Sequence, residues 1–272
     1  MTQILERRHR VILSKVKSKK TLHRKTEQRI LLLMLMIPLV SSTVFFVQQN
    51  LANAQYAPMK SGFVIQNLRG DITNTWLAWD LVEGRPLQIQ IQNDVNISTE
   101  KIDAIKEAII STKTVEINDL VMHKGTKESS SIYYIGWKGA TEKASQAETK
   151  YYIPTEFQIV ESKKGQADIV IELTSLSSGD GYTGYTKAIA DENHILKSHI
   201  TIYKADTLSA EQLETITRHE FGHALGLAHS TAPEDLMAPV IQTDYPYVSD
   251  CDIDTITTLY DGGKKSQVMC EK

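Results

Sequence analysis

One stretch of sequence, HEFGHALGLAH at residues 219–229, decides how this chain is read. His219 and His223 are four positions apart, so on a helix their imidazoles project from the same face, about one turn apart. Two imidazoles at that separation can bind one zinc ion. The helix cannot carry a third ligand to the same point, but Gly226 can adopt the positive φ that turns the chain back towards His229. The spacing therefore predicts a three-histidine zinc site with an open fourth position, which is typical of catalytic zinc.

Glu220 follows the first of these histidines directly and is not needed as a metal ligand. A carboxylate in this place can accept a proton from water on the metal, so Glu220 is the predicted general base. The alternative interpretation is an amphipathic helix with surface histidines. That interpretation leaves unexplained why a glutamate and a glycine stand between histidines at ligand spacing.

The helix that carries this stretch has clear end signals. Ser209 and Gln212 match a capping box, in which each side chain bonds a free backbone N–H of the other residue. Gly226 is a typical residue for ending a helix. Two further helices are predicted over residues 98–112 and 252–260.

Alternating or short apolar runs predict five strands, at residues 86–92, 132–137, 168–173, 185–190 and 199–203. Residues 55–80 read as irregular, and the polar residues 138–150 read as an exposed loop. Strands between an early and a late helix favour an α/β (α+β) domain with a mixed five-stranded sheet.

The N-terminal part of the chain predicts export. Residues 1–29 contain ten Lys or Arg and two Glu, and residues 30–47 are apolar and uncharged. Basic residues before an apolar run mark the side that stays in the cytoplasm. Residues 52–54 fit an A-x-A cleavage pattern, so either a signal peptide is cut after Ala54 or the uncut run anchors the chain in the membrane. Both outcomes place residues 55–272 outside the cytoplasm, and the formal net charge of −3 gives no reason to expect a nucleic-acid partner.

Two cysteines, Cys251 and Cys270, lie near the C-terminus. Outside the cell they could form one disulfide that closes the C-terminal tail. The other interpretation is two unpaired thiols, and the sequence leaves both open.

The pattern HExxHxxGxxH followed by a methionine turn resembles that of the metzincins. Asp235-Leu236-Met237 supplies the turn. Within the metzincins the chain most resembles the matrixins, the matrix metalloproteinase family, through HEFGHALGLAHS at 219–230 and the tail at 248–262. The resemblance is strong over residues 205–262 and weaker over 84–204. It implies a zincin-like fold with an active-site helix and a C-terminal helix.

The resemblance also implies a cleft with zinc at its base. An edge strand within residues 182–190 would pair antiparallel with an extended peptide substrate. Met237 would lie beneath the metal as a hydrophobic floor. The substrate pocket is assigned by the same resemblance to Tyr182, Gly184, Pro239, Val240 and Ile241.

Some features depart from the matrixin pattern. The histidine expected at the start of the Gly-rich loop 177–184 is absent, which favours one catalytic zinc ion and no second zinc. Structural calcium is compatible with the family but has no support in these residues. No cysteine precedes the zinc motif, so the usual cysteine-switch propeptide is missing, and residues 55–80 are too short for a folded prodomain. Any latency must therefore work differently.

The predicted function is that of an extracytoplasmic zinc metalloendopeptidase, a monomer that hydrolyses polypeptides and is secreted or anchored on the outer face of the cell membrane. Two alternatives stay open: a non-catalytic, zinc-stabilised binding module at the cell surface, and a hydrolase of non-peptide amides or esters. The predicted divisions are 1–54 (basic arm with signal peptide or anchor), 55–80 (linker or short N-terminal segment), 81–262 (matrixin-like catalytic domain) and 263–272 (C-terminal tail).

Overall fold

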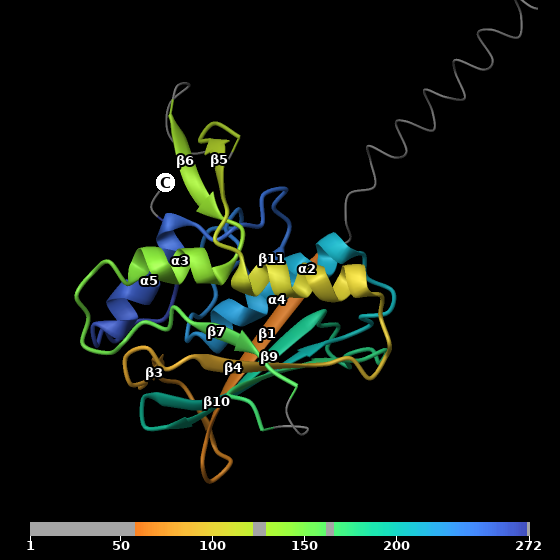
Figure 1. The fold of residues 1–272 in the computed structure, drawn as a ribbon, viewed down its shortest axis with the longest axis horizontal. Coiled ribbons are helices and arrows are strands. Elements are labelled where there is room, and N and C mark those ends of the chain that lie inside the picture. The colour runs from red at the N-terminus through yellow and green to blue at the C-terminus, as the bar shows by residue number, and fades with distance from the viewer. Residues whose placement is uncertain (1–57, 122–128, 162–165, 271–272) are drawn as a thin grey trace, which may run out of the picture. The chain divides into compact units, whose positions relative to one another are not determined.

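A computed structural model of the chain describes residues 58–121, 129–161 and 166–270 (Figure 1). Its helices are α2 (Thr99–Ile110), α3 (Trp137–Ala144), α4 (Ala210–Ala224) and α5 (Asp250–Tyr260). Its strands are β1 (Met59–Asn67), β2 (Ile72–Thr73), β3 (Ala78–Trp79), β4 (Leu87–Gln92), β5 (Thr114–Asn118), β6 (Ser130–Tyr134), β7 (Phe157–Ile159), β8 (Ile169–Leu173), β9 (Gly184–Asp191), β10 (His194–Ile202) and β11 (Val240–Ile241).

The apolar run at 30–47 and the cleavage pattern at 52–54 lie outside the described residues. Within the described ranges, no helix has the length and apolar character needed to cross a membrane.

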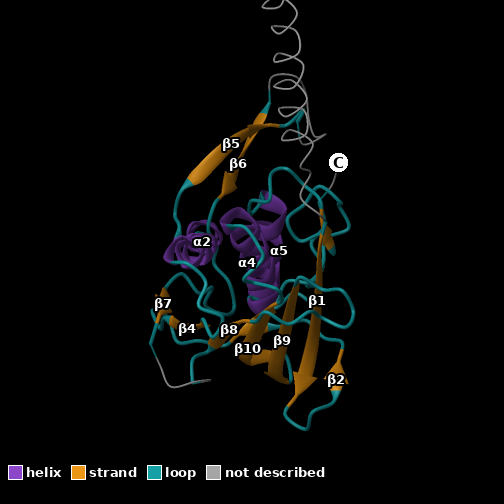
Figure 2. Cartoon of the chain, turned by 90° about the vertical axis from the view of Figure 1, so that its right-hand side faces the viewer, coloured by secondary structure: helices purple, strands orange, loops and turns teal. Residues whose placement is uncertain are grey.

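One mixed sheet organises the described residues from Pro58 onward. Its strands follow the order β11-β1-β9-β10-β8-β4-β7, with β2 paired to β1 and β3 paired to β10. The helices α2, α4 and α5 lie on one side of this sheet (Figure 2). The core fills the space between the layers with apolar side chains such as Ile89, Ile171 and Ile200 from the sheet and Ile105, Ile109, Leu213 and Ile216 from the helices. The predicted α/β class with a mixed sheet is confirmed, although the sheet has nine strands and not five.

The prediction that residues 55–80 are irregular is wrong. β1, at 59–67, lies inside the sheet between β9 and β11. Met59, Ser61 and Ile65 are buried there, so alternate side chains of β1 face the interior. Two of its partners, β9 and β11, lie more than a hundred positions further along the chain, where local sequence patterns carry no information about them.

Two other predictions are also wrong. Residues 138–150 do not form an exposed loop throughout, because α3 begins at Trp137 and buries small side chains, including Ala140 and Ala144. Residues 132–137 do not add a strand to the main sheet. Their first part belongs to β6, which pairs with β5 in a separate two-stranded sheet, and their last residue starts α3.

Helix α4 carries His219, Glu220 and His223 and is held by contacts at both ends. Ser209 and Gln212 form the predicted capping box. At the other end, Trp79 Nε1 donates to the Ala224 carbonyl at 2.9 Å, and the Tyr260 hydroxyl donates to the Leu225 carbonyl at 3.1 Å. These two bonds satisfy carbonyls that a helix end leaves without internal partners.

Arg218, also in α4, is fully buried and ties the helix to neighbouring loops. Its guanidinium donates to the carbonyls of Ile135 at 2.5 Å and Pro246 at 2.6 Å, and it pairs with Glu214 one turn earlier. Burial lowers the pKa of Arg218, and the Glu214 carboxylate opposes that shift. These contacts fix the rotation of α4 about its axis, which in turn fixes the direction of the side chains that follow.

The chain turns at Gly226, which has a φ of +107° as the sequence predicts. A Cβ at this position would lie 2.1 Å from the Leu77 carbonyl oxygen, so only glycine fits. The last helix, α5, is capped by Ser249 and tied to the C-terminal tail by a disulfide between Cys251 and Cys270. The disulfide resolves the alternative that the sequence left open.

Candidate metal centre

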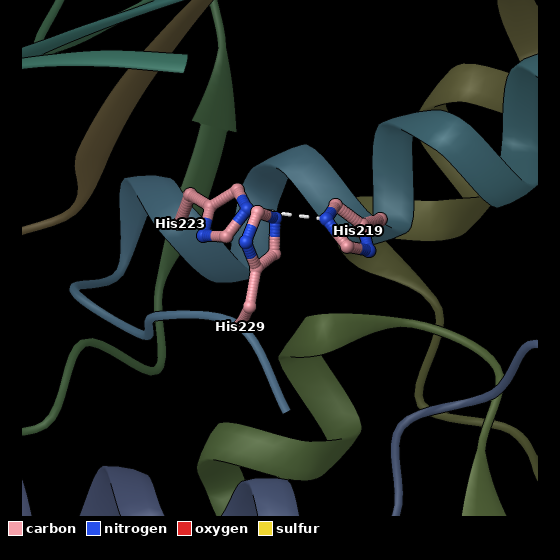
Figure 3. Close-up of side chains that lie close together, drawn as sticks. All are labelled: His219, His223 and His229. Carbon is pink, nitrogen blue, oxygen red and sulfur yellow. Dashed lines mark hydrogen bonds between the residues drawn. The ribbon is translucent and has the colours of Figure 1, made fainter. Parts of the chain in front are cut away.

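The structure brings His219, His223 and His229 together (Figure 3). The first two project from α4, and the third comes from the loop after the Gly226 turn. One ring nitrogen from each histidine lies within 4.8 Å of the others. Nε2 of His219 is 3.1 Å from Nε2 of His223. The three imidazoles therefore converge on one point, as ligands of a shared ion must.

The hydrogen bonds of the rings set their tautomers. Nδ1 of His219 lies 2.6 Å from the Leu236 carbonyl oxygen, and Nδ1 of His223 lies 2.8 Å from the Leu227 carbonyl oxygen. A carbonyl only accepts hydrogen bonds, so both Nδ1 atoms donate and both Nε2 atoms carry a lone pair. Two such lone pairs 3.1 Å apart repel each other unless a cation lies between them. Nε2 of His229 is also buried and has no hydrogen-bond partner.

This donor set fits zinc. Two nitrogens bound at about 2.1 Å to a tetrahedral ion lie about 3.4 Å apart, close to the observed separation of 3.1 Å between the Nε2 atoms of His219 and His223. Burial lowers the pKa of His219 to about 3 and that of His229 to about 4. The rings are therefore neutral near pH 7, which is the form that binds a metal.

The carboxylate of Glu220 is buried beside these histidines. Oε1 accepts a hydrogen bond from the Ser61 hydroxyl at 2.6 Å, and Oε2 accepts one from the Thr186 hydroxyl at 2.6 Å. Burial raises the pKa of Glu220 to about 8, and the two hydroxyl donors oppose that shift. A carboxylate with a pKa near neutrality can both accept and release a proton under physiological conditions.

Gly184 lies against this carboxylate. A Cβ at Gly184 would come within 2.4 Å of Oε1 of Glu220, so the strand approaches the helix as closely as it does only because this residue is glycine. A similar approach occurs on α4 itself, where a Cβ at Gly222 would lie 2.6 Å from the sulfur of Met237. Met237 is fully buried and therefore packs directly against the helix segment between His219 and His223.

The methionine turn is held by side-chain bonds. Asp235 accepts a hydrogen bond from the Met237 N–H at 2.8 Å and another from the Ser249 hydroxyl at 2.9 Å. Ser249 also caps α5 together with Asp252. The turn beneath α4 and the start of the last helix are thus parts of one hydrogen-bonded unit.

The residues assigned to a substrate pocket lie on both sides of β1. Gly184 begins β9 and pairs with Ser61, and Tyr182 lies just before it. On the other side, Val240 and Ile241 form β11, and the Pro239 carbonyl accepts a hydrogen bond from the Ser61 N–H at 3.1 Å. The expectation that the strand within 182–190 is an edge is therefore wrong for this structure, because β1 covers the free side of β9.

Two further histidines, His194 and His199, lie in β10. His199 is 2.9 Å from Glu172, and the ring of His194 packs edge-on against Tyr151. In the described ranges, the one further group with metal-ligand side chains is Asp235 with Cys251 and Cys270. Its two sulfurs are bonded to each other, so they offer no thiolate to a metal.

Two residues at the site were missed by sequence reasoning. Ser61 and Thr186 both bind the Glu220 carboxylate, yet neither belongs to a recognisable motif. For Thr186 a signal existed, since in a predicted strand it shares one face with Ala188 and Ala190. For Ser61 the sequence carries no such signal, because the strands β9 and β11 that pair with its segment lie far along the chain.

Comparison with known proteins agrees with this geometry. Residues 128–261 match the sequence model of the family described as Matrixin. Human matrix metalloproteinase-20 is 36% identical over 117 residues, which are 40% of this chain and 24% of that protein. Metalloendoproteinase 2-MMP of Arabidopsis thaliana is 37% identical over 73 residues, which are 26% of this chain and 19% of that protein. Human matrix metalloproteinase-25 is 31% identical over 135 residues, which are 43% of this chain and 24% of that protein.

The chain is therefore a matrixin-like protein, and its α/β fold is consistent with the matrixin catalytic domain. At the level of the family, the match supports a metalloendopeptidase. The chain spans about a quarter or less of the length of these curated relatives.

Proposed function

We propose that the chain is a zinc metalloendopeptidase that acts outside the cytoplasm. One observation carries this proposal: three neutral imidazoles converge within 4.8 Å while the carboxylate of Glu220 is buried on the same helix. His219, His223 and His229 would hold the ion, and Met237 would form the hydrophobic floor beneath it. When bound, zinc polarises the scissile carbonyl and lowers the pKa of water.

Glu220 acts as the general base in this proposal. It accepts the proton of the attacking water and passes it to the departing amine, as general acid–base catalysis requires. The hydroxyl of Thr186, 2.6 Å from Oε2 of the carboxylate, supports the role because it orients the side chain.

The substrates are polypeptides in extended conformation. An extended chain can add to the side of β9 through backbone hydrogen bonds, with little demand on its sequence. On the side of the substrate away from β9, the wall is formed by Pro239, Val240 and Ile241. Gly184 begins β9, and Tyr182 lies just before it. The bond to be cut would then lie over Glu220.

Extracytoplasmic location is supported by two features. The basic residues at 1–29 followed by the apolar run at 30–47 are typical of an export signal or a membrane anchor. The disulfide between Cys251 and Cys270 is typical of an oxidising compartment.

The test combines metal content with cleavage of a peptide library by the full chain. Wild type should bind one zinc per chain, and once β1 has been displaced from its place beside β9 it should cleave peptides. A chelator should stop this cleavage. Glu220→Gln should keep its zinc and lose at least about 100-fold in rate. His223→Ala should lose both zinc and activity. The matched control is Glu211→Gln, at an exposed position in the first turn of the same helix, which should behave as wild type.

Three results would contradict parts of the proposal. A Glu220→Gln variant that cleaves near the wild-type rate would rule out Glu220 as the base. A zinc-loaded chain that cleaves no peptide, even after β1 has been displaced from its place beside β9, would be a non-catalytic binding module. Cleavage of an ester or a non-peptide amide alone would indicate a different hydrolase.

A further inference from the structure

The strand β1 occupies the place that the proposed function gives to a polypeptide substrate. On one side it pairs with β9 along its length, from Ser61 opposite Gly184 to Asn67 opposite Ala190. On the other side it pairs with β11, with Lys60 opposite Val240. The groove between these two strands is thus filled by one extended segment of the chain itself.

β1 also contacts the groups proposed for the chemistry. The Ser61 hydroxyl binds the Glu220 carboxylate at 2.6 Å and lies 3.4 Å from Nε2 of His223. The ring of Phe63 stacks on His223 with 4.5 Å between ring centroids and meets His229 edge-on at 5.2 Å. These contacts leave Glu220 with no exposed surface and His223 with 4%. A substrate carbonyl cannot reach them while β1 is in place.

Contacts between the start of β1 and the segment before β9 help to keep β1 in place. The Lys60 ammonium lies 4.6 Å from the centre of the Tyr182 ring and donates to the Asp180 carbonyl at 3.1 Å. Gly62 passes so close to Tyr182 that a Cβ there would be 2.8 Å from the ring. Tyr182, assigned above to the substrate groove, is therefore engaged by β1.

The direction of β1 explains how it can block the groove without being a substrate. β1 runs parallel to β9. The peptide substrate expected from the matrixin resemblance runs antiparallel to it. In the parallel direction, the backbone carbonyls and amides of the strand are reversed with respect to the catalytic groups. At the centre of the site β1 places a hydroxyl, that of Ser61, against the general base.

We propose that β1 (Met59–Asn67) is an internal inhibitory strand, and that the chain is latent until β1 leaves the groove between β9 and β11. The inference rests on the proposed function, because it takes the covered groove as the substrate site. The topology permits release: in the part of the chain that the structure describes, β1 is the first element, and the exposed turn at 68–71 joins it to the next strand. Within the described residues, β1 can therefore withdraw without being threaded past another segment.

A disulfide across the strand pair provides the test. The Ser61 N–H donates to the Pro239 carbonyl, so the alternation of an antiparallel ladder makes Lys60 and Val240 a non-hydrogen-bonded pair. The Cα atoms of such pairs lie about 4.5 Å apart, within the range that a disulfide bridges. The full chain with Lys60→Cys and Val240→Cys can thus be locked by oxidation and opened by reduction. Val240→Cys alone is the control for the effect of the reductant on Cys251–Cys270.

Binding of a fluorescent peptide hydroxamate, which needs both the zinc and the open groove, is measured alongside zinc content. The oxidised double variant should bind the probe at least about 20-fold more weakly than its reduced form, at equal zinc content, while the single variant shows no such difference. Equal binding by the locked and reduced forms would overturn the inhibitory strand. Absence of zinc from every form would instead contradict the proposed function, so the two failures are distinguishable.

A second variant tests the proposal in the opposite direction. Met59 is buried and pairs with β11, so Met59→Lys should weaken the packing of β1 without changing the histidines or Glu220. Peptide cleavage should rise at least about 5-fold, and backbone amides of residues 59–67 should exchange hydrogen faster. Leu68→Lys, at a position 64% exposed in the turn after β1, should leave both unchanged. A Met59→Lys chain that exchanges faster at 59–67 but cleaves no faster would overturn the proposal.

Discussion

Thr186, in β9, donates its hydroxyl to Oε2 of Glu220 at 2.6 Å, so the strand proposed to receive substrate also holds the proposed base. The bond links two parts of the site that the sequence separates by 34 positions. It means that the position of β9 and the orientation of the carboxylate cannot vary independently.

The first prediction concerns this bond. Thr186→Val keeps the shape of the side chain but removes the donor, so one carboxylate oxygen loses its partner. In the Met59→Lys background, kcat should fall roughly 10-fold or more, because a hydrogen bond to a charged group is worth about 1.5–3 kcal/mol. Zinc content and KM should stay unchanged. Thr201→Val, on the neighbouring strand β10, is the matched control, and an equal fall in both variants would mean that the effect is not specific to Glu220.

The turn at Gly226 gives the second prediction. Gly226→Ala adds a Cβ that would lie 2.1 Å from the Leu77 carbonyl oxygen, in addition to the strain of a positive φ. The free energy of unfolding should fall by at least about 2 kcal/mol, and zinc affinity should fall because the turn positions His229. Gly181 separates the two causes, since it also has a positive φ but a Cβ there would have no neighbour within 4 Å. Gly181→Ala should therefore cost only about 1 kcal/mol, and equal losses measured by urea unfolding would contradict the steric explanation.

A pH-dependent prediction comes from Asp252, at the start of α5. Burial and the nearby Asp235 carboxylate raise the pKa of Asp252 well above its usual 3.8. The folded state therefore keeps a proton that the unfolded state releases. The stability that this group contributes is fully present below about pH 4 and is lost as the pH rises towards the folded pKa. Asp252→Asn supplies a permanent neutral side chain and should remove this loss.

Urea unfolding at several pH values between 4 and 7 checks this prediction. The difference in unfolding free energy should move in favour of Asp252→Asn as the pH rises, by up to about 1.4 kcal/mol per pH unit. Asp254→Asn, exposed on the same helix, should show no such trend. A difference between wild type and Asp252→Asn that is constant with pH would show that the proton is not held in the folded state.

The elements around the motif were predictable because their signals are local. The capping box at Ser209 and the glycine at 226 define the ends of α4 from neighbouring residues alone, and histidines at i and i+4 must share a helix face. The convergence of His229 on the same point followed from the one turn that glycine permits.

The elements that the sequence did not reveal depend on distant partners. β1 has a strand conformation because β9 and β11 pair with its two sides. No residue within β1 itself indicates these distant partners. α3 buries Ala140 and Ala144, and its N-cap, Gly136, makes no side-chain hydrogen bond. After Trp137 at its first position, α3 has no large apolar residue, and it lacks a capping side chain, so residues 138–150 read as a polar loop.

X-ray absorption at the zinc edge of the full chain tests the central claim most directly, because it needs neither activity nor release of β1. The account predicts one zinc per chain with three nitrogen neighbours at about 2.0–2.1 Å, one of which is lost in His229→Ala. Sulfur neighbours at about 2.3 Å, or a zinc environment unchanged by the loss of His229, would contradict it.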